Sequence, residues 1–219
     1  NFGLMGTFSF YFSHHMTTIE GGMIVTDDDD LADLLRMLRS HGWARKEKKA
    51  KDIPFHERYH FLTTGFNLRP TELNAAFGLH QLKKLEALNK NRISATKLLL
   101  DHLRPLIDNK FFSTMKVTEN VDAVYFGFPI ICRSTQERDA LVVHLEHLDI
   151  ETRPIVCGNM ARQPALNQVA YKAIGDLKGA DQIMDRGLYW GIHPKFSETE
   201  IRYIGNALES FPWPLRHPS

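Results

Sequence analysis

The feature that most constrains this fold is a long face of helical spacing between two prolines, Pro70 and Pro105. Apolar residues recur there three or four positions apart, which is typical of one side of an α-helix. The face comprises Leu73, Ala76, Phe77, His80, Leu82, Leu85, Leu88, Ile93, Leu98 and Leu103. Proline is favoured in the first helical turn and disrupts a helix interior. The spacing therefore predicts one long helix, or two helices in line, that begins at Pro70 or Thr71 and ends at Pro105.

The region before this helix predicts two short strands and one shorter helix. Residues 6–12 and 23–26 are rich in β-forming residues and are bounded by glycine. The acidic run 27–30 precedes leucines at helical spacing, and we expect it to cap a helix that ends near Gly42 rather than to bind a metal. A two-stranded sheet is marginally stable by itself. We therefore expect residues 1–108 to be the C-terminal part of a larger domain, together with its long linking helix.

After residue 108 the pattern changes to alternating strands and helices. Strands are predicted at Val117, over 121–132 and over 150–156, and helices over 134–148, 180–189 and 197–210. Ser197, with Glu200 three residues later, is a capping-box signature for the last helix. The alternation indicates an α/β or α+β domain. We therefore expect a small C-terminal α/β domain over residues 109–219.

Charge and cysteine content exclude several functional classes. Lysine and arginine total 27 against 26 aspartate and glutamate, a formal net charge of +1, so no basic field favours nucleic acid as a partner. Two cysteines cannot build a disulfide framework or a cluster held by four thiolates, and they fit a reduced, cytoplasmic compartment. No apolar run approaches the roughly 20 residues that span a bilayer, so no membrane association is expected. The first residue is asparagine rather than methionine, so we expect a fragment or a processed product.

The segment from Ser9 to Gly22 carries the residues most able to do chemistry. A serine hydroxyl and backbone amides can hold a phosphate, and His14 can act as an acid or a base near neutral pH. The alternative is that His14 and His15 are ordinary polar residues. Adjacent histidines rarely bind one metal ion and no third ligand is near, so we expect no metal site. The basic stretch that begins at Arg45 is either a solvated loop or a contact for a phosphate-bearing ligand.

Four blocks, in order along the chain, resemble the DegT-type family of sugar aminotransferases. They are Ser9 with Glu20-Gly21-Gly22, the segment 65–76 that leads into the long helix, the segment 150–164, and the segment 191–194 with the helix that follows it. The resemblance covers essentially the whole chain. It implies the α/β fold of fold-type I transferases that depend on pyridoxal phosphate (PLP), of which this chain holds the C-terminal part of the large domain and the small domain.

One position departs from the aminotransferase pattern. The family's cofactor lysine is replaced by His14, and no lysine lies between residues 1 and 45. An imidazole cannot form a Schiff base, but it can transfer protons. In the family, histidine at this position marks the branch of sugar 3-dehydratases, which the His-His pair and the Glu-Gly-Gly turn also match. The type with an iron–sulfur cluster needs four cysteines, so the resemblance favours the cluster-free type, which acts on a GDP-linked 4-keto-6-deoxymannose-like sugar.

For this chain the resemblance implies pyridoxamine phosphate or PLP bound non-covalently. His14 would be the base in removing the C3 hydroxyl of a nucleotide-linked 4-keto-6-deoxy sugar, in deoxysugar and lipopolysaccharide biosynthesis, with glutamate as amino donor. Ser9 would bind the cofactor phosphate, and Asn67 would bind the same phosphate from the second subunit of a homodimer. Arg45 and Arg69 are expected to contact the substrate phosphates, because a guanidinium grips such oxygens as a fork.

Alternatives stay open at this level. Arg45 also fits a solvated loop charge, and Asn67 a turn residue at the helix entry. Ile19 stands where the family has glycine and predicts an altered turn, because isoleucine disfavours positive φ. The competing functions are a nucleotide-sugar aminotransferase, which His14 argues against, and a truncated, non-catalytic family member. The latter is supported because the aromatic residue that stacks on the cofactor ring, and the acid for its ring nitrogen, are expected upstream of residue 1.

Overall fold

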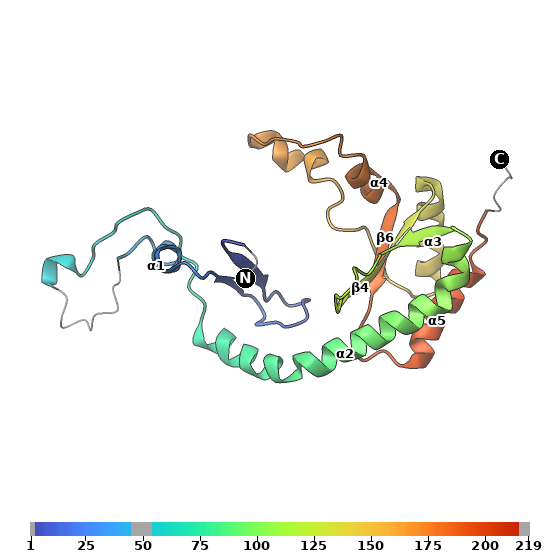
Figure 1. Cartoon of the computed structure of the whole chain (residues 1–219), viewed down its shortest axis with the longest axis horizontal. Coiled ribbons are helices and arrows are strands. Elements are labelled where there is room, and N and C mark those ends of the chain that lie inside the picture. Colours follow the sequence, from blue (N-terminus) through green and yellow to red (C-terminus); the bar gives the residue numbers. More distant parts are fainter. Residues whose placement is uncertain (1–2, 45–53, 215–219) are drawn as a thin grey trace. The chain divides into compact units, whose positions relative to one another are not determined.

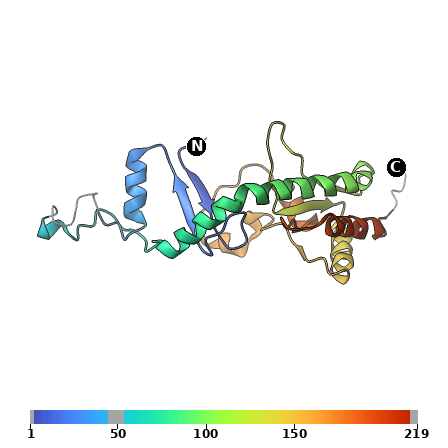
Figure 2. The same ribbon diagram turned by 90° about the horizontal axis from the view of Figure 1, so that it is seen from below.

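The structure is a computed structural model that describes residues 3–44 and 54–214 (Figure 1). It divides into two compact units, residues 1–86 and residues 87–219. Helix α2 (Glu72–Asp108) contributes turns to both units, and Figure 2 shows it as one continuous helix. None of the helices in the described ranges combines the length and the hydrophobicity that crossing a lipid bilayer requires.

The first unit is built on a two-stranded antiparallel sheet. Its elements are β1 (Gly6–Ser9), β2 (Gly22–Val25), α1 (Asp29–Leu38), the 3₁₀ helix η2 (Phe55–Glu57) and the N-terminal turns of α2. The sheet register places Ser9 opposite Gly22. The Asp28 carboxylate accepts a hydrogen bond of 2.9 Å from the Leu31 amide. The acidic run therefore caps α1, and this prediction is confirmed.

Helix α2 is a single helix, and its start agrees with the prediction. The predicted end at Pro105 is wrong, because Pro105 lies inside the helix. Proline removes the hydrogen bond of its own nitrogen but keeps its carbonyl as an acceptor. The Asn109 amide donates to the Pro105 carbonyl at 3.1 Å, so the helix closes one further turn beyond the proline.

The second unit is a four-stranded antiparallel sheet with helices packed on it. Its elements are the end of α2, β3 (Phe112–Thr114), β4 (Gly127–Cys132), α3 (Thr135–His147), β5 (Thr152–Arg153), η3 (Met160–Arg162), η4 (Pro164–Gln168), α4 (Lys178–Arg186), β6 (Gly187–Gly191) and α5 (Glu198–Ser210). The strand order is β3-β4-β6-β5. The Ser134 hydroxyl caps α3, and Ser197 forms the predicted capping box with Glu200 at the start of α5. The predicted mixture of helices and strands is confirmed.

Several strand predictions for this unit are wrong. Val117 and residues 121–126 lie in a loop, in which Asn120 has a φ of 62°. Only Thr152–Arg153 pairs within the predicted strand 150–156, and β3 was not predicted. β-branched and aromatic residues favour strands in general, but a segment becomes a strand only where a partner pairs with it.

Strand β6, at the centre of the sheet, is also a strand because neighbouring strands pair with it. Residues 187–189 were predicted to end a helix, but α4 stops at Arg186 and Gly187 begins the strand. β6 pairs with β4 on one side and with β5 on the other. Its extended conformation therefore depends on two neighbours that are distant in the sequence, and local spacing does not reveal them.

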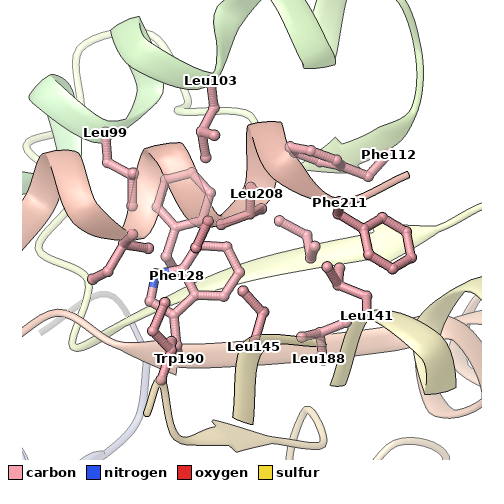
Figure 3. Packing of buried hydrophobic residues seen from close by; sticks show 14 of the residues in the cluster. Leu99, Leu103, Phe112, Phe128, Leu141, Leu145, Leu188, Trp190, Leu208 and Phe211 are labelled. Carbon is pink, nitrogen blue, oxygen red and sulfur yellow. The ribbon is translucent and has the colours of Figure 1, made fainter. Parts of the chain in front are cut away.

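The core of the second unit joins α2, α3, α5 and the sheet (Figure 3). Phe128 of β4 stacks on Trp190 of β6 with ring centroids 5.2 Å apart. Leu99 and Leu103 of α2 are completely buried in this core. The last turns of α2 therefore belong to the second unit. The two units divide between residues 86 and 87, inside α2, and the domain boundary near residue 108 stays a prediction.

We expect Leu145→Ala to lower the free energy of unfolding by about 2–5 kcal/mol, because it leaves a cavity in place of a side chain with 0% exposure. Val143→Ala is the matched control on the same helix, since Val143 is 55% exposed, and should change it by less than about 0.5 kcal/mol. Urea denaturation followed by tryptophan fluorescence measures both. Equal losses in the two variants would contradict the assigned core.

Candidate active site

The segment predicted to carry the chemistry folds as a loop between β1 and β2, residues 10–21, which we call the histidine loop. The Phe10 amide donates to the Gly21 carbonyl and the Thr18 amide donates to the Phe10 carbonyl, both at 2.9 Å. Gly21 has no room for a side chain, because a Cβ there would overlap Thr18 Oγ1. The pairing of β1 with β2 therefore continues into the loop and closes it.

The His14 imidazole is oriented by the strand end that precedes it. Its Nδ1 lies 3.2 Å from the Ser9 carbonyl oxygen, and its ring meets Tyr11 edge-on with centroids 5.9 Å apart. A carbonyl oxygen only accepts hydrogen bonds, so in the neutral ring Nδ1 carries the proton and Nε2 carries the lone pair. His14 is exposed. The loop therefore presents Nε2 as a base.

Ser9 ends β1 with an exposed side chain. Its Oγ accepts a long hydrogen bond, 3.4 Å, from the Tyr11 amide. Within the described ranges the Ser9 hydroxyl proton has no acceptor, so it can be donated to an anionic oxygen. The structure thus brings together Ser9 and His14, two of the site residues expected from the sequence.

The turn at Ile19 keeps a glycine-like backbone. Ile19 has a φ of 73°, a conformation that costs a residue with a Cβ roughly 1–2 kcal/mol. Thr17 Oγ1 accepts from the Ile19 amide at 2.9 Å, and Thr18 Oγ1 donates to the Glu20 carbonyl at 2.9 Å. These two threonine hydroxyls hold the turn in its left-handed conformation although isoleucine replaces the family's glycine.

Asn67 and Arg69 form a second pair of expected site residues. Asn67 pairs with Ser40 in an antiparallel bridge, and Arg69 Nη2 donates to Asn67 Oδ1 at 3.3 Å. A guanidinium only donates, so the amide oxygen of Asn67 faces Arg69 and its NH₂ group points elsewhere. Both side chains are exposed. The NH₂ group of Asn67 is therefore available to donate a hydrogen bond to a ligand.

The structure does not join the two pairs. In the described part of the chain, neither Asn67 nor Arg69 hydrogen-bonds to Ser9 or His14. Arg45, the remaining expected contact for substrate phosphates, lies outside the described residues.

A polar cluster in the second unit was not predicted as a site. Asn159, which is 3% exposed, donates to Asp181 at 2.7 Å, and Arg162 binds both carboxylate oxygens of Asp181 at 3.0 and 2.9 Å. These hydrogen bonds, first from Arg162 and then from Asn159, lower the pKa of Asp181 to about 2. Asn159 and Arg162 belong to the block 150–164 that resembles the family, but Asp181 lies on α4. Local sequence holds no signal for that partnership.

The two cysteine thiols lie in different surroundings. Burial raises the pKa of the Cys132 thiol to about 12. Cys157 is half-buried and precedes the polar cluster by two residues. Across residues 3–44 and 54–214, no three histidine, cysteine, aspartate or glutamate side chains gather as a metal site would require.

Comparison with known proteins gives consistent matches over the whole chain. The model of the DegT/DnrJ/EryC1/StrS aminotransferase family matches residues 1–209. GDP-4-keto-6-deoxy-D-mannose 3-dehydratase from Yersinia pseudotuberculosis is 36% identical, over 95% of this chain and 54% of that protein. This chain therefore spans about half the length of the curated relatives it matches.

Solved structures show the same likeness. The GDP-4-keto-6-deoxy-D-mannose-3-dehydratase of E. coli with bound hydrated PLP matches with a TM-score of 0.84 and 34% identity, over 95% of this chain and 55% of that one. GDP-4-keto-6-deoxymannose-3-dehydratase with a trapped PLP-glutamate geminal diamine matches with a TM-score of 0.84 and 33% identity, over 95% of this chain and 55% of that one. The expected fold, that of the PLP-dependent aminotransferases, is confirmed.

The depressed pKa of Asp181 predicts a specific pH dependence. Since folding lowers this pKa from its ordinary value near 3.9 to about 2, the stability it contributes is complete above about pH 4 and disappears as the pH falls through 2. We therefore expect the difference in urea midpoint between the wild type and Asp181→Asn to shrink from pH 5 to pH 2. Asp101→Asn, which removes an exposed carboxylate paired with Arg104 on α2, is the control. A constant difference for Asp181→Asn would contradict the assigned cluster.

Proposed function

Because this chain belongs to the DegT/DnrJ/EryC1/StrS aminotransferase family, we propose that it is part of a 3-dehydratase that removes the C3 hydroxyl of a GDP-linked 4-keto-6-deoxymannose-like sugar. The observation that carries the proposal is His14, an exposed imidazole held through Nδ1 in a loop without lysine. The relative from Y. pseudotuberculosis, which is named for this reaction, supports it. The activity is proposed for the protein that carries this chain.

The histidine loop fits a pyridoxamine or pyridoxal phosphate held without a covalent bond. Ser9 offers the phosphate an exposed hydroxyl donor at a strand end. Residues 3–44 contain no lysine, so the loop cannot form a Schiff base with the cofactor. The neighbour solved with hydrated PLP supports this choice of cofactor. When bound, the cofactor supplies an electron sink for the elimination.

His14 performs the proton transfers in this proposal. Its Nε2 would take up the proton that the C4′ carbon of the bound cofactor releases, and the Ser9 carbonyl would stabilise the resulting imidazolium because Nδ1–H already donates to it. The protonated Nε2–H can then give its proton to the departing C3 hydroxyl, which leaves as water. The hydroxide thus comes from the sugar, while the proton and the electron pair that expels the hydroxide would come from the cofactor, whose amine form glutamate would restore; His14 returns to its neutral form.

Asn67, from a second copy of the chain, and Arg69 complete the proposed site. The amide NH₂ of Asn67, oriented by Arg69, suits the cofactor phosphate, and the remaining guanidinium donors of Arg69 suit the substrate phosphates. Arg45 is proposed for the same substrate role.

The remaining partners follow from the same chemistry. Glutamate is the proposed amino donor, and the neighbour with the PLP-glutamate adduct supports it. A deoxysugar product of this kind suits lipopolysaccharide biosynthesis. The reducing cytoplasm is the proposed location, since both cysteines are free thiols.

We expect His14→Asn to slow C3 dehydration by roughly 10²–10⁴-fold, the usual contribution of a general base. The protein that carries this chain is incubated with PLP, glutamate and GDP-4-keto-6-deoxymannose, and mass spectrometry follows the loss of the C3 hydroxyl from the sugar. His80→Asn, which replaces an exposed histidine of α2, is the matched control and should keep the wild-type rate.

The competing function gives a different product in the same assay. Transfer of an amino group to the sugar without loss of water, at a rate that His14→Asn leaves unchanged, would overturn the dehydratase proposal and favour an aminotransferase.

A further inference from the structure

The histidine loop is held by a side chain that lies 56 residues away in the sequence. Asn74, in the first turn of α2, donates its Nδ2 to the Thr18 carbonyl at 2.6 Å and to the Glu20 carbonyl at 3.1 Å. One amide group thus bridges the two residues that flank Ile19. Asn74 lies in the segment 65–76 that leads into the long helix, and the local sequence pattern indicates no role for it.

The chemistry of these contacts fixes the orientation of the Asn74 side chain. Both carbonyls only accept hydrogen bonds, so the NH₂ group of the amide must face them. On the opposite side, the Thr71 hydroxyl donates to Asn74 Oδ1, and the Asn74 backbone amide donates to Thr71 Oγ1 at 3.3 Å. The amide is therefore satisfied on both sides and cannot rotate without losing hydrogen bonds.

One turn further along α2, Gly78 allows the loop to approach the helix closely. Gly78 is buried, and a Cβ there would lie 2.9 Å from Thr18 Cγ2 and 3.4 Å from Met16 Cε. Thr18 itself is only 7% exposed. Asn74 and Gly78 share one face of the helix, since they are four residues apart. Together they form a seat on α2 for the second half of the loop.

The seat holds the histidine loop at Ile19, the residue at which the backbone of the loop is strained. Ile19 has a left-handed backbone, and the two carbonyls bound by Asn74 belong to its immediate neighbours. Along the chain, His14 lies between Ser9, whose carbonyl oxygen binds its Nδ1, and residues 18–20, which Asn74 holds. If the contacts of Asn74 and Gly78 with the loop were lost, the turn at Ile19 would relax. The part of the histidine loop that carries the His14 imidazole would then move.

We infer that Asn74 is a positioning residue for His14: its amide fixes the histidine loop on α2, and the fixed loop sets where Nε2 of His14 stands. The inference rests on the proposed function for its kinetic consequence. Its structural consequence, a change in the environment of the His14 ring, does not depend on any reaction.

The test is Asn74→Asp, which keeps the size of the side chain and its acceptor for Thr71 but sets a carboxylate oxygen against two carbonyl oxygens. Asn91→Asp is the matched control, because Asn91 is an exposed asparagine of the same helix. Two readouts are used. The first is the kcat and KM of dehydration, and the second is side-chain nitrogen NMR of histidine in the ligand-free protein, with His14 assigned by its absence in His14→Asn.

We expect Asn74→Asp to lower kcat by about tenfold or more with less than about a threefold change in KM, because a displaced base weakens the transition state rather than substrate binding. In the NMR spectrum the His14 ring should lose its preference for the Nδ1–H tautomer. Asn91→Asp should change neither readout.

A second variant separates positioning from folding. Gly78→Ala improves the helix propensity of α2 but crowds the Thr18 methyl group. It should therefore shift the His14 NMR signal and lower kcat in the same direction, even if Asn74→Asp proves poorly folded by circular dichroism.

The outcomes test the proposed dehydratase function and the positioning role of Asn74 separately. If the wild type shows no dehydration, the proposed function fails, while the NMR comparison still decides the role of Asn74. If the wild type is active and neither variant changes kcat or the His14 tautomer, the inference about Asn74 is overturned.

Discussion

The first unit depends on the fact that a backbone carbonyl oxygen accepts hydrogen bonds and never donates them. The Ser9 carbonyl therefore decides which nitrogen of His14 carries the proton, and the Thr18 and Glu20 carbonyls decide how the Asn74 amide faces. All three carbonyls belong to a strand end or to a tight turn, where the ladder between β1 and β2 leaves them available. The main-chain carbonyl at a strand end thus orients the His14 ring, and two further main-chain carbonyls tie its loop to the Asn74 side chain.

Local signals in the sequence predicted the elements that depend on local chemistry. The predicted caps at Asp28 and Ser197 are confirmed because each side chain accepts a hydrogen bond from the amide three residues away, and Ser134 caps α3 in the same way. The wrong predictions concern features that depend on distant partners. β6 is a strand because β4 and β5 pair with it, and α2 continues past Pro105 because Leu106 and Ile107 pack against the core of the second unit.

The residues of the candidate site also fall into two groups, those that local sequence predicts and those that depend on distant partners. Ser9 and His14 were found by pattern, since they lie five residues apart in one segment, and their hydrogen bond links the Ser9 backbone to the His14 ring. Asn74 and Asp181 were not found as functional residues, because each acts on residues from another block of the chain. Ile19 shows a third case: its side chain disfavours the backbone it adopts, and only the threonine hydroxyls and the Asn74 amide around it explain why the turn persists.

The contrast between the two thiols has a practical consequence for work on this molecule. With a pKa near 12 and a buried position, Cys132 holds almost no thiolate at neutral pH and is shielded from reagents. Cys157 is half-buried, and it sits beside the hydrogen-bonded cluster of Asn159, Arg162 and Asp181. A maleimide dye or spin label should therefore attach at this single natural position without any engineered cysteine. The second unit thus carries its own reporter site beside this polar cluster.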